Sequence, residues 1–212
     1  NRIFSYSSLT RFLGFTSRSG GMLLLPVFLL NIRGLDEFTI GFLMFSGALG
    51  LGIGAQSGGR LSDIFGRRRF VIFGFVLAVL NSMLMAWYHQ ETPLLLIVLT
   101  LFVNGISMGL WSTPNQVITV NATPKSKFGP VGALINLTRN TGNVTGQAIA
   151  TAVIAAVLGF QGFDIELSQV GIMEGSVEAF THAWRAAYLA IICVLCLAIF
   201  TAFQTRSIPS KN

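Results

Sequence analysis

Six long apolar stretches dominate this chain and restrict what it can fold into. They lie near residues 8–31, 39–59, 70–88, 93–118, 130–160 and 184–203. A helix needs about 20 mostly apolar residues to cross the hydrocarbon core of a bilayer, and a lone segment in lipid satisfies its backbone hydrogen bonds only as a helix. Only 10% of the 212 residues are charged, against about 25% in soluble domains. The sequence therefore predicts an all-α integral membrane protein in which residues 1–212 form one bundle of six transmembrane helices.

The charges between these stretches alternate in sign from one connection to the next. One side holds Arg2, Arg11, Arg60, Arg67, Arg68, Arg69, Lys125, Lys127, Arg206 and Lys211, with Asp63 as its one carboxylate. The other side holds Asp36, Glu37, Glu91, Asp164, Glu166, Glu174 and Glu178, beside Arg33 and Arg185. An excess of Lys and Arg marks the cytoplasmic face. We therefore expect a multi-pass protein of the plasma (inner) membrane with both termini in the cytoplasm, and we attribute the net charge of +6 to this topology rather than to nucleic acid binding.

The most basic connection is the segment Gly59–Arg69. We expect a tight loop there, because Gly59 and Gly66 permit a sharp turn and close backbone approach. Asp63 lies among four arginines, so its carboxylate should be ionised and paired with Arg67 or Arg68. A simpler alternative is that the arginines of this segment only fix the topology and bind lipid phosphates.

The pattern formed by Gly59, Asp63, Gly66, Arg67 and Arg68, G-x-x-x-D-x-x-G-R-R, resembles the signature loop of the major facilitator superfamily of transporters. The resemblance implies that these five residues act as a conformational latch on the cytoplasmic side. Such a latch stabilises one state of an alternating-access cycle and breaks when the carrier changes face.

The fifth apolar stretch carries a polar stripe. At about 100° per residue, one arc of the helix collects Asn136, Arg139, Asn140, Asn143 and Gln147. Such a stripe cannot face lipid, and an intramembrane cation is by default a functional candidate. We expect these residues to line a substrate cavity. The alternatives are that Arg139 neutralises a carboxylate on a helix outside this chain, or that it snorkels to the membrane surface.

The first and fourth stretches carry polar faces as well. Ser7, Arg11, Gly14 and Arg18 share one face of the first stretch, and Asn104, Met108, Trp111 and Asn115 share one face of the fourth. An amide, a thioether and an indole side by side suit an amphipathic organic ligand, so Arg18, Asn104 and Trp111 join the cavity candidates. Snorkelling by Arg18 and ordinary interhelical hydrogen bonding by Asn104 stay open. Pro114 is expected to break or bend the fourth helix, and the almost wholly apolar third and sixth stretches are expected to face lipid.

Small residues at four-residue spacing predict close helix packing. Gly50, Gly54 and Gly58 form such a series in the second stretch, and Gly142 and Gly146 form one in the fifth. The run Asn136–Ala148, N-x-x-R-x-x-G-x-x-x-G-x-A, together with Pro124 and Gly129 before it, is similar to the late helices of the drug:proton antiporters with fourteen spans. The resemblance implies that the chain is the carboxyl-terminal half of such a transporter and that an amino-terminal half is missing. Since the chain does not begin with Met, we expect a fragment.

The resemblance implies secondary active transport by alternating access, in the form of proton-coupled efflux of drugs or other organic compounds. No Asp or Glu lies within the six stretches apart from Asp63 at a boundary, so a carboxylate for proton coupling is expected in the missing half. The intramembrane arginines leave an organic-anion carrier of the same fold as an alternative, and a non-transporting membrane assembly protein is another. Because the sequence offers neither a buried nucleophile with a base nor a cluster of metal ligands, we expect no enzyme, no metal site and no cofactor.

Overall fold

The computed structural model describes residues 2–124, 128–163 and 175–205, and the regular structure of these residues is entirely helical. The long helices are α1 (Arg2–Val27), α2 (Glu37–Phe65), α3 (Arg67–Ala86), α4 (Leu94–Asn121), α5 (Phe128–Phe160) and α6 (Ser176–Gln204), and a π-helix, η1 (Phe28–Ile32), continues α1. Within the described part of the chain, six spans are long and apolar enough to cross a membrane, with α1 and η1 counted as one span. The predicted all-α bundle with six membrane spans is confirmed.

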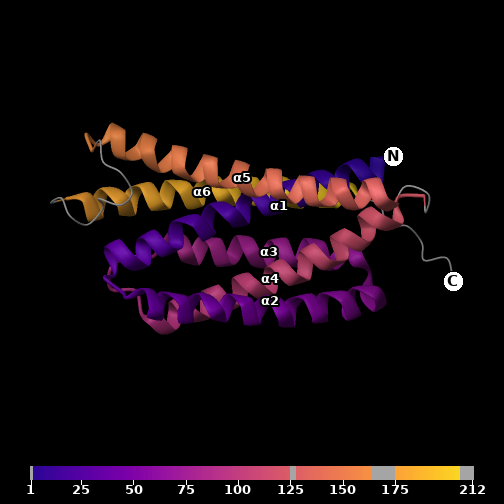
Figure 1. The fold of residues 1–212 in the computed structure, drawn as a ribbon, viewed down its shortest axis with the longest axis horizontal. Coiled ribbons are helices and arrows are strands. Elements are labelled where there is room, and N and C mark those ends of the chain that lie inside the picture. Colours follow the sequence, from indigo (N-terminus) through magenta and orange to yellow (C-terminus); the bar gives the residue numbers. More distant parts are fainter. Residues whose placement is uncertain (1, 125–127, 164–174, 206–212) are drawn as a thin grey trace.

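The six helices lie in two groups of three, α1 with α5 and α6, and α4 with α2 and α3 (Figure 1). Within these groups α2 packs most extensively on α4, and α5 packs most extensively on α1. Likewise α3 packs on α4 and α6 on α1, while α3 and α6 contact each other. The contacts of α1–α3 are thus repeated by α4–α6. As a result α1 and α4, which also contact each other, lie at the centre of the bundle, and α2 and α5 lie on opposite flanks.

The pairing of α2 with α4 depends on glycines at the contact. A Cβ at Gly54 would lie 2.7 Å from the Cα of Ile106, and one at Gly58 would lie 3.0 Å from the carbonyl oxygen of Gly109. A Cβ at Gly50 would collide with the carbonyl of Phe102. The close approach predicted by the glycine spacing therefore occurs, and the partner helix is α4. We call this contact the α2–α4 glycine seam.

A second glycine seam joins α1 to α5. A Cβ at Gly142 would lie 2.8 Å from the carbonyl oxygen of Phe12, and one at Gly146 would collide with the carbonyl of Thr16. The hydroxyl of Ser19 donates to the carbonyl of Asn143 across the same contact, at 2.9 Å. Two equivalent seams therefore fix both flanking helices against the central pair.

Aromatic side chains close the end of the bundle at which α1 ends and α6 begins. Trp184 is fully buried, and its ring lies 4.9 Å from that of Phe28 and 4.8 Å from that of Tyr188, measured between centroids. The indole Nε1 of Trp184 donates to the carbonyl of Met85 at 2.8 Å. These contacts join η1, α3 and α6 at one point of the core.

The prediction of a loop over Gly59–Arg69 is wrong about the length of the loop. Helix α2 continues to Phe65 and α3 begins at Arg67, so Gly66 alone separates the two helices. Gly66 has a φ of 100°, which is inexpensive only for a residue without a Cβ, so this glycine makes the turn. Gly59 lies inside α2 and takes no part in the turn, and Asp63 occupies the last turn of α2.

Other expected boundaries shift because the helices extend beyond the apolar stretches. Helix α1 begins at Arg2, and α6 begins at Ser176 and so includes Phe180, which is fully buried. Pro114 does not break α4, which runs on to Asn121. Helices α3 and α6 keep exposed apolar residues such as Leu80 and Leu189, although they also pack on each other.

Seven of the charged residues from which the topology was predicted lie outside the described residues: Lys125, Lys127, Asp164, Glu166, Glu174, Arg206 and Lys211.

Substituting Gly54 by Ala should destabilise the bundle, because the new methyl group meets the backbone of α4. Overpacking of this kind costs about 1–3 kcal/mol, so we expect a lower midpoint of thermal unfolding, followed by circular dichroism in detergent. Gly52→Ala is the matched control, since a Cβ there meets nothing within 4 Å and alanine favours the helix. Equal midpoints for the two variants would show that the seam does not hold the bundle together.

Candidate functional site

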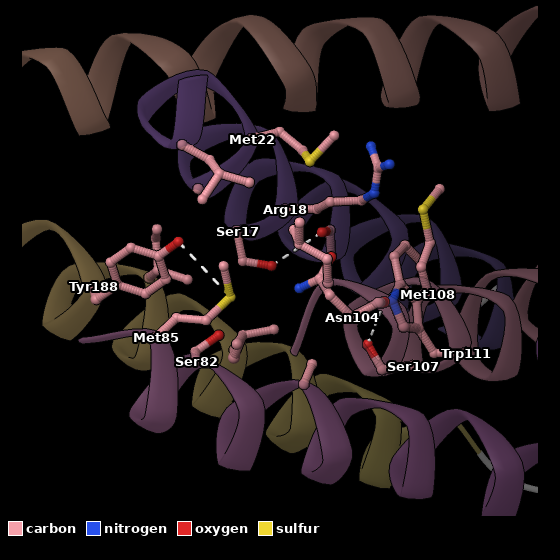
Figure 2. A pocket seen from close by; sticks show the side chains of 17 residues that line it. Ser17, Arg18, Met22, Ser82, Met85, Asn104, Ser107, Met108, Trp111 and Tyr188 are labelled. Atoms are coloured by element: carbon pink, nitrogen blue, oxygen red, sulfur yellow. Dashed lines mark hydrogen bonds between the residues drawn. The ribbon is translucent and has the colours of Figure 1, made fainter. Parts of the chain in front are cut away.

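A cavity lies among α1, α3, α4 and α6, at the centre of the bundle, and we call it the central cavity (Figure 2). Its polar and sulfur-bearing walls come from all four helices: Ser17, Arg18 and Met22 on α1, Ser82 and Met85 on α3, Asn104, Ser107 and Met108 on α4, and Tyr188 on α6, with Trp111 of α4 beside them. The structure thus brings together three residues that the sequence predicted for a cavity, namely Arg18, Asn104 and Trp111.

Most hydroxyl groups around the central cavity are already hydrogen-bonded within the protein. Ser17 donates to the carbonyl of Gly14 at 2.9 Å, and Ser107 donates to the carbonyl of Asn104 at 2.8 Å. By contrast, the Nε of Arg18 is buried without a hydrogen-bond partner among the described residues. The guanidinium of Arg18 is therefore a polar group that remains available to a bound molecule.

The depth of Arg18 bears on the alternative of snorkelling, which the sequence left open. The helix begins at Arg2, and Arg18 falls near the middle of the 31-residue span Arg2–Ile32. At about 1.5 Å per residue, its Cα is about 24 Å from the start of α1, which makes snorkelling to that surface a poor explanation. Neither α1 nor α4 contains an Asp or Glu. A cation in this position is costly to bury and marks a functional site.

Trp111 forms a rigid wall of the central cavity. Its ring stacks on Phe75 at 4.8 Å and meets the edge of Phe15 at 5.3 Å, and only 2% of its surface is exposed. Gly14 provides the space, since a Cβ there would lie 2.6 Å from the indole. Met108 lines the cavity next to it and is an adaptable contact for an apolar group.

Asn115 does not join the cavity, although the helical wheel placed it on the face of Asn104, Met108 and Trp111. It is 1% exposed and lines no part of the central cavity. The physical reason is distance along the axis: four residues beyond Trp111, about 6 Å farther along α4, the helix has passed the end of the cavity.

A second cavity lies among α1, α4 and α5, and we call it the basic cavity. It is lined by two arginines, four other polar residues and four apolar ones: Arg11, Arg139, Ser112, Thr113, Gln116, Asn121, Phe15, Met108, Val117 and Val120. The sequence predicted a cavity role for Arg139 but treated Arg11 as a topology-determining cation. The sequence placed Arg11 on one helix face with Arg18, but the predicted span did not extend back to Arg2. Because the helix begins at Arg2, Arg11 lies well inside it.

The rest of the α5 stripe faces outward. Asn136, Asn140 and Gln147 are exposed, and Asn143 is only partly buried. None of these four lines either cavity, so their role in a substrate cavity stays a prediction. They face outward because α5 buries only the narrow seam around Gly142 and Gly146 against α1, which leaves most of its circumference uncovered.

The structure pairs Asp63 with Arg67. One carboxylate oxygen of Asp63 accepts from the Nη2 of Arg67 at 2.7 Å and from its Nε at 3.0 Å. Arg68 makes different contacts: its guanidinium donates to the carbonyl of Phe203 and lies 5.6 Å from the centre of that ring. Of the two predicted partners, Arg67 is therefore confirmed, and Arg68 instead ties the start of α3 to the end of α6.

Comparison with known proteins agrees with this architecture. Residues 7–212 match the family model of the Major Facilitator Superfamily. The lincomycin resistance protein LmrB of Listeria monocytogenes is 26% identical over 204 residues, which cover 92% of this chain and 43% of LmrB. The riboflavin transporter RibZ of Clostridioides difficile is 25% identical, over 87% of this chain and 40% of RibZ. The multidrug resistance protein Stp of Mycobacterium tuberculosis is 27% identical, over 65% of this chain and 26% of Stp. The chain thus spans less than half the length of these relatives.

Replacing Arg18 by Met should leave the bundle as stable as before or make it more stable. The substitution keeps an unbranched side chain and removes a half-buried cation whose Nε has no partner among the described residues, and such replacements are often neutral or stabilising. Trp184→Phe is the comparison variant, because it removes the bond to Met85 and should cost at least about 1 kcal/mol. Thermal unfolding in detergent measures both, and a loss for Arg18→Met as large as that for Trp184→Phe would show that Arg18 is a structural residue.

Proposed function

Because the chain belongs to the major facilitator superfamily, we propose that it is the carboxyl-terminal six-helix half of a secondary active transporter that exports drugs or other organic compounds in exchange for protons. Members of this family and the relatives named above are transporters, so the chain is not an enzyme. The observation that carries the proposal is the central cavity, which brings Arg18 and Asn104 together with apolar and aromatic side chains.

The central cavity encloses only about 30 Å³ in this structure, so an organic molecule would enter it only in another state of the transport cycle, but the side chains of its walls suit an amphipathic organic molecule. A solute of this class buries its apolar part against Met108 and Trp111 and places a polar group near Asn104 or Arg18. Two of the relatives are named for organic compounds of this general kind, lincomycin and riboflavin. These compounds are therefore the first cargo candidates for this chain.

An amino-terminal half would complete the transporter and cover the surfaces that this half leaves open. Helix α2 exposes large apolar side chains such as Phe42 and Phe45, and α5 exposes the polar residues Asn136, Asn140 and Gln147. In an alternating-access carrier the second half faces such surfaces and supplies the opposite cavity wall. Helices α1, α3, α4 and α5 contain no Asp or Glu, so we place the carboxylate for proton coupling in that other half.

The distribution of charge gives the proposed orientation. The end of the bundle at which α2 meets α3 holds Arg60 and the run Arg67–Arg69, whereas Asp36, Glu91 and Glu178 lie at the opposite end. The chain also begins at the basic end (Figure 1). By the positive-inside rule, the basic end faces the cytoplasm, with both termini on that side of the plasma membrane.

An organic-anion carrier of the same fold is the second candidate, and Arg18 is the observation that favours it. The central cavity contains this cation and no carboxylate. Transport by Arg18→Gln separates the two functions. An anion carrier loses its flux, whereas an exporter of neutral compounds keeps most of it.

Asn104→Leu should reduce export about tenfold, because a hydrogen bond to the cargo is worth about 1 kcal/mol and the leucine also leaves a polar cargo group unpaired. The assay is efflux of lincomycin and riboflavin from cells that express the full-length transporter. Gln204→Leu is the control, because it removes an exposed amide at the end of α6. Undiminished efflux of a transported compound by Asn104→Leu would contradict the assignment of the cavity.

Asp63→Asn should slow transport while the protein still inserts, because it weakens the ionic contact to Arg67 between α2 and α3. An exposed pair contributes up to about 1 kcal/mol, so we expect an effect of up to about fivefold on turnover. Turnover is measured in proteoliposomes against the amount of inserted protein, and Arg69→Gln is the control within the same segment. Wild-type turnover in a well-expressed Asp63→Asn variant would reject the latch.

A further inference from the structure

We infer that the basic cavity is a binding site for an oxyanion, a carboxylate or a phosphate group held between Arg11 and Arg139. The site is separate from the central cavity, and the inference does not depend on what the transporter exports.

The first observation is the state of Arg11. Only 5% of this residue is exposed, and its Nε and Nη1 are buried without a hydrogen-bond partner among the described residues. The guanidinium lies 5.1 Å from the ring centre of Phe15. Stacking on the ring holds the guanidinium plane in place, but the N–H groups at its edge are left unsatisfied. Charged donors of this kind are rarely buried without an acceptor, so Arg11 lacks the group that it is placed to bind.

The second observation is that the charge in this cavity is uncompensated. Arg139 of α5 is exposed but lines the same cavity, close enough for the two positive charges to repel each other. The three helices that form the walls, α1, α4 and α5, contain no Asp or Glu. Two cations that share a cavity with no carboxylate destabilise each other, and an anion between them removes this repulsion. The planar fork of a guanidinium matches carboxylate and phosphate oxygens in particular.

The remaining walls of the basic cavity fit the same ligand chemistry. On α4, the hydroxyls of Ser112 and Thr113 and the amides of Gln116 and Asn121 line the cavity and can donate to further anion oxygens. Val117 and Val120 of the same helix offer contact to an apolar body attached to the anionic group. The cavity therefore has donors for an oxyanion and no acidic side chain that would repel it.

The basic cavity adjoins the central cavity without being part of it. Met108 lines both cavities, and the contact between the rings of Phe15 and Trp111, at 5.3 Å, joins the walls of the two. A bound oxyanion would therefore be separated from the central cavity by the rings of Phe15 and Trp111, and it would lie nearer the basic end of the bundle.

The bound oxyanion can come from two sources: it can be a soluble oxyanion or the phosphate of a lipid headgroup. The test uses the full-length transporter that contains this chain, in nanodiscs of phosphatidylcholine, titrated with sodium benzoate and with inorganic phosphate and followed by isothermal titration calorimetry. We expect the wild-type transporter to bind at least one of these probes. Arg11→Gln and Arg139→Gln should each weaken binding at least about tenfold, since each removes a charge-assisted hydrogen bond.

Arg69→Gln is the matched control, because it removes an exposed arginine near the same end of the bundle and should leave the affinity within about twofold of wild type. Arg11→Lys is the second variant, used if Arg11→Gln fails to fold by circular dichroism. It keeps the charge but loses the fork, so it should bind more weakly than wild type and still measurably.

The lipid source is tested in nanodiscs that also contain phosphatidylglycerol, by measuring the lipid that stays bound to the purified transporter with native mass spectrometry. Retention of phosphatidylglycerol that needs both Arg11 and Arg139, without binding of the soluble probes, supports the oxyanion site with a lipid as its ligand. The inference is overturned if the wild-type transporter binds neither probe nor lipid at this site, or if both glutamine variants bind as tightly as wild type. Since every readout is binding, a failure of the proposed transport function leaves this result unaffected.

Discussion

Direct backbone contact at glycines is the constraint on which the rest of this bundle depends. In lipid, helices gain little from burying apolar side chains against one another, so close packing of small residues has to hold them together. At the α2–α4 glycine seam a Cβ on Gly50 or Gly54 would meet the backbone of α4, and Gly142 and Gly146 make the same kind of contact with α1. At these two seams α2 packs closely on α4, and α5 packs closely on α1. The placement of α1 and α4 at the centre of the bundle follows from these contacts.

With α1 and α4 at the centre, several polar residues of these helices line cavities instead of facing lipid. Arg18 and Asn104 line the central cavity, and Arg11 lines the basic cavity. No acidic residue of α1, α4 or α5 balances these arginines. These arginines are costly to bury, and each of them lies in a cavity where a ligand can bind. The aromatic side chains of Phe15, Trp111 and Phe75 pack on one another and form rigid walls beside both cavities.

The sequence predicted the helices and their number because apolar stretches of membrane length have one stable backbone solution in lipid. It located the turn residue Gly66 but not the extent of the turn, since charged residues at helix ends, such as Asp63 and Arg67, stay helical outside the apolar stretches. It named three residues of the central cavity, because a helical wheel gives the face of a residue. It could not give the depth at which a residue lies or the helix that it faces, so it did not predict that Arg11 lines a cavity. The partner of each glycine series also depends on tertiary packing and became visible only in the structure.

The most direct test of this account is whether water reaches position 104 in the membrane. In a background with Cys193→Ala and Cys196→Ala, which removes the two exposed free cysteines of α6, Asn104→Cys is treated with a charged, membrane-impermeant thiol reagent and compared with Phe200→Cys on the exposed apolar face of α6. If α1 and α4 enclose a solute cavity, the cysteine at position 104 is modified and the one at position 200 is not. Equal protection of the two cysteines in correctly inserted protein, on both sides of the membrane, would contradict the central cavity.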